Sequence, residues 1–351
     1  MSKKFDYINA LRGLAIFMVI AVHTLQHGTK THSKLLDQII DSGARGVQLF
    51  FVTSAFTLFL SFNNREEEQN KTLNFFIRRF FRIAPMYYLG ILFFSLVTNN
   101  ATMGSVISNI FFVHGLHPDW VLKLVPGGWS ISVEMLFYCL LPLLIKKITT
   151  INKAIYLFIG AVIFNYFFQI TLYSKEWSDF LFLSFPNHFS VFVCGIVAYL
   201  LVIKKDYQVG GKPLFLLAVL LLLHVIIGGN NSYVGLSGIA FMGLLIALSK
   251  RRIKILVNPF FTYLGEVSYS SYLVHFAVIM ALERFHFVDY IDVNNKLTGI
   301  LNYTIRFLLI LSCTMVIATL FYRFVELPMQ KVGRNLIRLL NVSEVKTPSE
   351  R

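Results

Sequence analysis

The sequence predicts an all-α, polytopic integral membrane protein, a helical bundle with about ten transmembrane helices. Of its 351 residues, 56% are hydrophobic and only 14% are charged, whereas soluble domains have about a quarter of their residues charged. Long uncharged runs such as Pro213 to Ile227 and Phe307 to Tyr322 are too numerous to be hidden in one soluble core. A lipid bilayer is therefore the expected solvent.

Each apolar stretch is taken in turn as a candidate span, long enough to cross a bilayer. The ten predicted spans are 8–26, 45–62, 83–98, 129–146, 153–172, 180–203, 213–228, 231–249, 267–285 and 302–325. The first is expected to stay, because it is followed by His23, Gln26 and His27 and not by a small-residue cleavage site. We predict one transmembrane domain over 1–335 and a basic cytoplasmic tail over 336–351.

The basic residues lie in short clusters at the ends of the apolar segments, although the net charge of +14 alone would suggest nucleic-acid binding. Placing the N-terminus in the cytoplasm puts roughly 24 of the 32 Lys and Arg residues, including Lys3 and Lys4, on that side. Both termini are then cytoplasmic. The polar loop Asn63 to Asn74 faces the cytoplasm, and the long segment Asn99 to Gly128 faces outward and folds back over the outer face.

Cysteine and histidine usage points to no metal site. Cys139, Cys194 and Cys313 each lie inside an apolar run, which suggests neither a disulfide framework nor a thiolate site. His114 and His117 lack an accompanying set of acidic or thiolate ligands.

Ionisable residues inside the predicted spans are functional candidates, because each costs at least a few kcal/mol to insert. Arg12 and His23 are eleven residues apart in the first span, which places them on one helix face, about 16 Å apart along the axis. Arg12 lies at the cytoplasmic end and His23 towards the outside. The alternatives are a snorkelling anchor for Arg12 and a hydrogen-bonded helix end for His23.

A carboxylate is expected at the depth of His23. The run Trp129 to Glu134 enters the fourth span from the outside and carries Glu134 about one turn below the interface. A histidine and a carboxylate at matching depth can form a base and its orienting partner. A structural hydrogen bond to a neighbouring helix is the alternative for Glu134.

Three arginines, Arg78, Arg79 and Arg82, alternate with aromatic residues on the cytoplasmic side. Guanidinium clusters suit phosphate groups, which they bind through charge-assisted bonds. Attraction to anionic lipid is the alternative.

The ninth span spaces Ser268, Tyr272 and His275 at helical intervals of four and three, so they share a polar face turned away from lipid. Packing and substrate lining are equally compatible with this face. Glu326, near the end of the last span, is expected to pair with Arg323 or Arg12 as a structural residue.

These residues belong to motifs that recur in one order along the chain. The motifs are Asp6-Tyr7-Ile8 to Arg12-Gly13 with His23, Phe50-Phe51 to Phe56, Arg78 to Pro85, Trp129-Ser130 to Glu134, Ser268-Tyr269 to His275, and Glu326-Leu327-Pro328. Together they resemble the membrane acyltransferase-3 family, whose members acylate bacterial surface sugars. The likeness covers nearly the whole chain and is to the stand-alone type without a fused esterase-like domain. Ala55 departs from it, since members often have glycine there.

The resemblance implies roles for individual residues. Arg12 and His23 would form the essential pair, with His23 catalytic. Glu134 would be a further active-site acid. Arginines Arg78, Arg79 and Arg82 would handle the acyl-coenzyme A donor. The expected substrate-lining residues are Trp129, Ser130, Tyr269, Tyr272 and His275.

The expected activity is a membrane O-acyltransferase in the bacterial inner membrane. It would move an acyl group, acetyl in the first instance, from cytoplasmic acyl-coenzyme A to a sugar hydroxyl of a surface polysaccharide or its lipid-linked precursor. The coenzyme head would stay at the arginines while its pantetheine arm spans the gap of about 16 Å to His23. The sequence leaves open whether His23 is a general base, which we favour, or itself accepts the acyl group.

The rival function is a transporter or flippase of a lipid-linked sugar, in which buried Arg, His and Glu would line a pathway. Two features disfavour it: the halves of the chain show no evident repeat, and the arginine–aromatic run is cytoplasmic. A scaffold protein would leave the buried ionisable residues unexplained.

Overall fold

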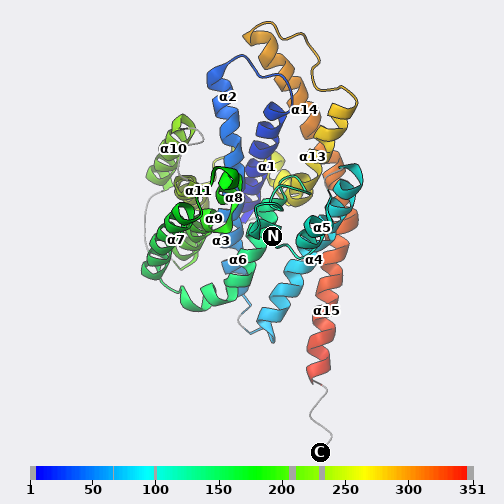
Figure 1. Ribbon diagram of the computed structural model, residues 1–351. Helices are drawn as coiled ribbons and strands as arrows, with labels where there is room; N and C mark the ends of the chain where they lie inside the picture. Colours follow the sequence, from blue (N-terminus) through cyan, green and yellow to red (C-terminus); the bar gives the residue numbers. More distant parts are fainter. Residues whose placement is uncertain (1–4, 66, 99–100, 205–210, 229–233, 346–351) are drawn as a thin grey trace, which may run out of the picture.

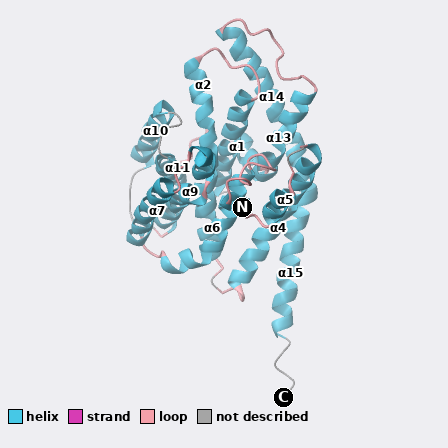
Figure 2. Ribbon diagram, in the orientation of Figure 1, coloured by secondary structure: helices cyan, strands magenta, loops and turns pink. Residues whose placement is uncertain are grey.

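A computed structural model describes residues 5–65, 67–98, 101–204, 211–228 and 234–345. This part of the chain consists of helices joined by loops and has no strand (Figure 2). The helices are α1 (Asp6–Gln26), α2 (Lys34–Asp41), α3 (Gly46–Asn63), α4 (Lys71–Val97), α5 (Met103–Ile110), α6 (Gly128–Lys147), α7 (Ile151–Thr171), α8 (Ser178–Leu183), α9 (Phe185–Ile203), α10 (Gly211–Gly228), α11 (Val234–Lys250), α12 (Pro259–Glu266), α13 (Ser268–Arg284), α14 (Lys296–Phe321) and α15 (Leu327–Val345). The 3₁₀ turn η2 (Ser42–Arg45) joins α2 to α3, and the π-helical segment η6 (Tyr322–Glu326) joins α14 to α15.

The predicted multi-pass helical architecture is confirmed. Seven helical stretches of the described residues are long and apolar enough to cross a membrane, and two shorter apolar helices, Gly211–His224 and Val234–Lys250, accompany them. Most of each predicted span is helical within the described residues: 231–249 is described from Val234 onward, and 180–203 is divided between α8 and α9 at Ser184. The count of ten crossings and the cytoplasmic placement of both termini stay predictions.

Some topological predictions concern residues outside the described ranges. These are the basic residues Lys3, Lys4 and Lys205, the outward connection at 229–232 and the end of the tail at 346–351.

Two helices extend further than the hydropathy pattern predicts. Helix α4 begins at Lys71, twelve residues before the predicted span at 83, so the whole arginine–aromatic run is helical. Helix α15 continues through the expected domain boundary at 335 and extends beyond the other helices at the end opposite α2 (Figure 1). The helix continues there because Gly333 packs against Phe81 of α4, so it is held by tertiary contacts as well as by its own sequence.

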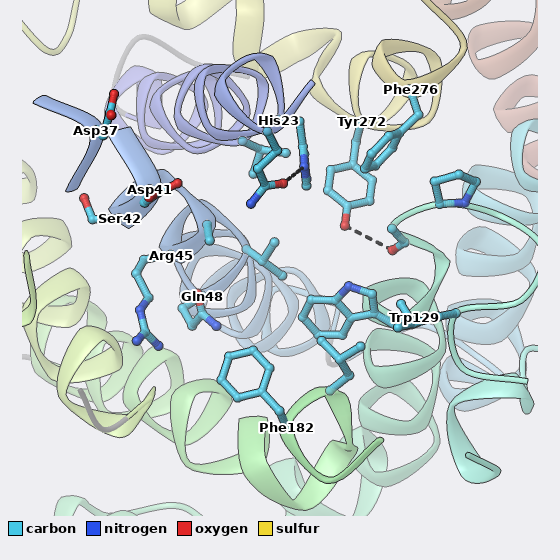
Figure 3. A pocket seen from close by; sticks show the side chains of 18 of the residues that line it. His23, Asp37, Asp41, Ser42, Arg45, Gln48, Trp129, Phe182, Tyr272 and Phe276 are labelled. Carbon is cyan, nitrogen blue, oxygen red and sulfur yellow. Dashed lines mark hydrogen bonds between the residues drawn. The ribbon is translucent and has the colours of Figure 1, made fainter. Parts of the chain in front are cut away.

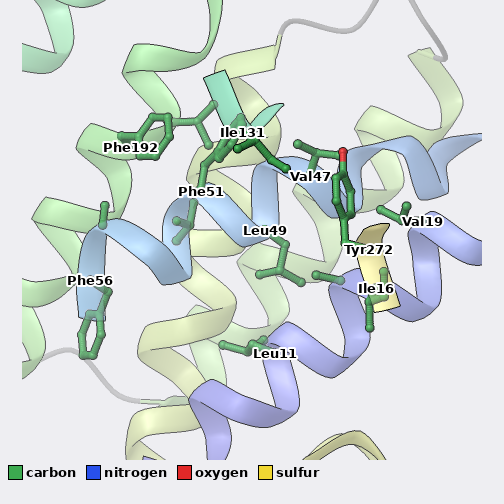
Figure 4. Packing of buried hydrophobic residues seen from close by; sticks show 14 of the residues in the cluster. Leu11, Ile16, Val19, Val47, Leu49, Phe51, Phe56, Ile131, Phe192 and Tyr272 are labelled. Atoms are coloured by element: carbon green, nitrogen blue, oxygen red, sulfur yellow. The ribbon is translucent and has the colours of Figure 1, made fainter. Parts of the chain in front are cut away.

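Helix α1 is the central element of the bundle and contacts α3, α12, α13 and α14. Leu11 and Ile16 of α1 pack against α3 residues such as Leu49 (Figure 4). Against α12, the backbones themselves are in contact: a methyl group on Gly13 would lie 1.9 Å from the Phe261 carbonyl oxygen. In lipid no hydrophobic effect drives helices together, and small residues such as glycine let two helix backbones approach closely enough to pack. The position of His23 and Arg12 is thereby fixed by the core.

Ala55, the departure from the family pattern, is accommodated by a glycine on the neighbouring helix. It is fully buried on α3. A methyl group added to Gly195 of α9 would lie 2.7 Å from the Ala55 Cβ. The extra methyl group therefore fills space that Gly195 leaves open.

The segment between α4 and α6 packs into the bundle. Val121, Leu124 and Val125 are buried, and the Tyr87 hydroxyl of α4 donates a 2.6 Å hydrogen bond to Asn109 of α5. His114 is also buried, and burial lowers its pKa. This segment leads into Gly127, whose φ of +73° favours glycine, at the start of α6.

Candidate active site

A cavity of about 980 Å³ opens beside the C-terminal end of α1; we call it the large cavity (Figure 3). It is lined by the end of α1, by α2 and η2, and by the starts of α3 and α6 together with α8 and α13. Its side chains are Val19, His23, Gln26, Lys30, Lys34, Asp37, Gln38, Asp41, Ser42, Ala44, Arg45, Val47, Gln48, Leu122, Pro126, Gly127, Trp129, Phe182, Leu183, Tyr272 and Phe276. The mixture of aromatic faces with charged and amide groups suits a polar ligand of moderate size.

His23 lies half-buried at the wall of the large cavity. Its ring packs on Phe276, 4.5 Å between centroids, and its Nδ1 lies 2.9 Å from the Gln26 side-chain oxygen. The expected pairing with Glu134 is not formed. Glu134 faces a different cavity, and its carboxylate accepts hydrogen bonds from Ser54 and Tyr138.

His275 lies directly behind His23 and is fully buried, with 5.4 Å between the ring centroids. Its Nδ1 lies 3.2 Å from the Ser271 carbonyl, which can only accept, so this nitrogen carries the proton. Its Nε2 has no partner among the described residues. His275 thus supports the His23 ring and does not line the cavities found beside it.

A second cavity, of about 80 Å³, lies deeper in the bundle; we call it the small cavity. It is lined by Arg12, Val47, Phe50, Phe51, Ser54, Arg79, Arg82, Ile83, Ser130, Ile131, Glu134, Tyr138, Ser268, Tyr269 and Tyr272. Three guanidinium groups against one carboxylate make it cationic, which suits an anionic or strongly polarised ligand.

The arginines of the small cavity have different partners. Arg12 donates a 3.0 Å hydrogen bond to Thr57 of α3. Arg79 lies over the rings of Phe75 and Tyr138, and its buried Nε meets no partner within the described part of the chain. A buried donor without a partner is costly, so this Nε is available to a ligand.

Glu134 is held by hydroxyl groups. It accepts hydrogen bonds from Ser54 of α3 and from Tyr138, one turn further along α6, at 2.7 Å. Both partners hold the carboxylate in the small cavity beside the arginines, where it offsets part of their charge.

Arg78 is separated from the other two arginines. It points away from the small cavity and forms a bidentate ion pair with Glu68, at 2.7 and 2.8 Å. These hydrogen bonds lower the pKa of the Glu68 carboxyl below its usual value. The ion pair of Arg78 with Glu68 therefore ties the loop before α4 to the helix.

The two cavities adjoin at Tyr272 and Val47, which line both. The Tyr272 hydroxyl lies 2.8 Å from the Ser130 hydroxyl and donates to the Gly127 carbonyl at 3.1 Å. Trp129 faces the large cavity and Ser130 the small one. Tyr269 also lines the small cavity and donates to the Ile83 carbonyl at 2.7 Å.

Some residues of the site were missed by the sequence interpretation. Arg45 and Gln48 are buried at the wall of the large cavity. Arg306, 1% exposed, donates to the carbonyl of Thr24, the residue after His23. Arg306 lies inside the predicted span 302–325, so its insertion cost was a usable signal. Arg45 stands at the edge of its predicted span and Gln48 is uncharged, so neither gave such a signal.

Glu326 is buried where α14 passes into α15, and it accepts a hydrogen bond from Ser270 of α13. The expected partner Arg323 is exposed. Among the described residues, no group of three His, Cys, Asp or Glu side chains lies close enough to hold a metal ion.

The fold and these two adjoining cavities define a multi-pass helical membrane protein with a buried polar site of the kind that enzymes use. The chain belongs to the membrane acyltransferase-3 family, whose acyltransferase domain matches residues 5–323. The predicted resemblance is confirmed.

Similar curated proteins come from Staphylococcus aureus. One is "Putative O-acetyltransferase SACOL0978" of strain COL, and another is "Putative O-acetyltransferase SAS0844" of strain MSSA476. Each is 25% identical over 385 aligned positions, which cover 97% of this chain and 59% of the relative. The chain therefore spans 59% of the length of these relatives. No solved structure matches it.

Proposed function

We propose that this chain is an O-acetyltransferase that moves an acetyl group from cytoplasmic acetyl-coenzyme A to a sugar hydroxyl of a surface polysaccharide or its lipid-linked precursor. The family supports acyl transfer, and the names of the relatives support acetyl as the group. The observation that carries the proposal is that an arginine-lined cavity adjoins the cavity that holds His23, with Tyr272 and Val47 lining both.

The donor's coenzyme head would lie at the small cavity, where Arg12, Arg79 and Arg82 are placed to attract its phosphates. The pantetheine arm would carry the thioester from there to His23, across the gap of about 16 Å between Arg12 and His23 along α1.

The acceptor would occupy the large cavity. Trp129 and Phe182 offer flat faces for the apolar side of a sugar ring, and Gln48 offers a buried amide whose side-chain oxygen has no partner in the described structure. The volume of about 980 Å³ is within the range of small-molecule sites and admits one or more sugar units.

His23 is the general base in this mechanism. Its Nε2 takes the proton from the acceptor hydroxyl while the oxygen attacks the thioester carbonyl carbon. The carbon–sulfur bond then breaks, the coenzyme leaves as its thiolate, and the proton on His23 passes to the sulfur.

The test is His23→Gln in protein reconstituted with radiolabelled acetyl-coenzyme A and surface carbohydrate. Glutamine keeps hydrogen-bonding ability but cannot take a proton at neutral pH. We expect transfer to fall by at least about 100-fold, the usual contribution of a general base, while donor binding is retained.

His224→Gln, which alters an exposed histidine of α10, is the matched control and should transfer normally. Near-normal transfer by His23→Gln would show that His23 only packs. A wild-type protein that leaves all label on the coenzyme would instead favour a transporter.

A further inference from the structure

The end of α1 carries a polar contact between the side chains of His23 and Gln26, to which the proposed mechanism assigns no role. The Nδ1 of His23 lies 2.9 Å from the Oε1 of Gln26. We propose that Gln26 is the positioning residue of His23: its carbonyl oxygen accepts from Nδ1–H and leaves Nε2 as the proton-accepting nitrogen. This inference rests on the proposed role of His23 as general base.

The contact follows from helix geometry. Residues three apart lie on one helix face, one turn from each other, and Gln26 is the last residue of α1. Both side chains line the large cavity, whose wall at His23 is seen in Figure 3. Because Gln26 is at the end of α1, its side chain can reach the His23 ring along the same helix face.

The neighbouring histidines do not compete for this contact. His27 is paired with Glu283 at 2.8 Å, and the protonated nitrogen of His275 is committed to the Ser271 carbonyl. Among the described side chains, Gln26 is the one that hydrogen-bonds to the His23 ring. The tautomer of His23 therefore depends on Gln26.

The tautomer matters because neutral imidazole carries one proton on two nitrogens. With Gln26 accepting, the proton resides on Nδ1 and the lone pair on Nε2. With the amide reversed, its nitrogen would donate to Nδ1, Nε2 would carry the proton, and the base would be blocked at that nitrogen. A neutral amide also orients the ring without adding a charge to the acceptor cavity.

Substitutions at Gln26 separate these cases. Gln26→Met keeps the length but cannot donate and accepts only weakly, and we expect kcat to fall about tenfold, the factor for one neutral hydrogen bond, with the KM for the donor unchanged. Gln26→Glu can only accept, and at mildly alkaline pH it should retain at least wild-type kcat. Gln330→Met on α15, at the opposite end of the bundle, is the matched control.

Nitrogen NMR of histidine-labelled protein gives a readout independent of activity. Wild-type His23 should show a protonated Nδ1, and Gln26→Met should shift the population towards the Nε2–H form. Equal kcat for Gln26→Met and wild type, or an Nε2–H form in the wild type, would overturn the inference. Failure of the proposed function looks different, because His23→Gln would then transfer as well as wild type.

Discussion

Arg306 is expected to hold the catalytic end of α1 in place. It lies in α14, which is long and apolar enough to cross a membrane. Its side chain is 1% exposed and makes four hydrogen bonds. They reach the carbonyls of Thr24, Thr29 and Val288 and the carboxylate of Asp289, at 2.8–3.1 Å. Arg306→Met keeps the length and removes all donors.

The cost can be worked from the surroundings of these acceptors. A hydrogen bond to a charged group is worth about 1.5–3 kcal/mol in soluble proteins, whereas bonds inside membrane bundles average about 0.6 kcal/mol. The Asp289 side chain is 42% exposed, so water can replace the guanidinium there. Thr24 is fully buried, so its carbonyl is left unpaired. We expect a loss of about 2–5 kcal/mol.

The assays are thermal unfolding in detergent and acetyl transfer. Arg306→Met should lower the apparent melting temperature by several degrees and reduce transfer, because the turn that carries His23 loses its anchor. Arg284→Met, at an exposed arginine near the end of α13, is the control and should change neither. If Arg306→Met and Arg284→Met had the same apparent melting temperature, Arg306 would not anchor this end of α1.

Two further predictions concern the donor site and the topology. Arg79→Gln should raise the concentration of acetyl-coenzyme A needed for half-saturation about 10-fold or more, because one charge-assisted bond to the donor is lost. Arg78→Gln is the control: it should leave half-saturation unchanged and weaken only the contact with Glu68. Equal effects of the two substitutions in a donor titration would contradict the assignment. Arg251→Cys in intact cells should resist a thiol probe that cannot cross the membrane, and its labelling would reverse the predicted orientation.

The helical architecture was predictable because it depends on composition over long windows. Hydropathy placed the predicted spans on helices of the described structure, since each apolar run in lipid must satisfy its own backbone hydrogen bonds. The ends of α4 and α15 were not predictable in this way. Both continue outside the apolar region, where contacts such as Gly333 on Phe81 stabilise the helix.

The candidate residues were found because buried ionisable groups are costly, but their grouping was only partly predicted. Arg12, Arg79, Arg82 and Glu134 share one cavity, whereas the prediction grouped Arg79 and Arg82 with Arg78 and placed Glu134 beside His23. The partner of His23 was predicted to be Glu134 and is Gln26. Depth along a helix can be estimated from sequence, but the rotation of one helix against another cannot.

The sequence by itself determined that the chain is a multi-pass helical membrane protein of the acyltransferase-3 family, because apolar length and motif order survive without knowledge of packing. Only the tertiary structure decided which polar groups meet. It divided the site into two adjoining cavities that share Tyr272, moved Arg78 to the ion pair with Glu68, and hydrogen-bonded Arg306 to the turn that carries His23. The physical reason is that a side chain's partner depends on how neighbouring helices are rotated and how closely they approach, and residues far apart in the chain, such as Gly13 and Phe261, set both.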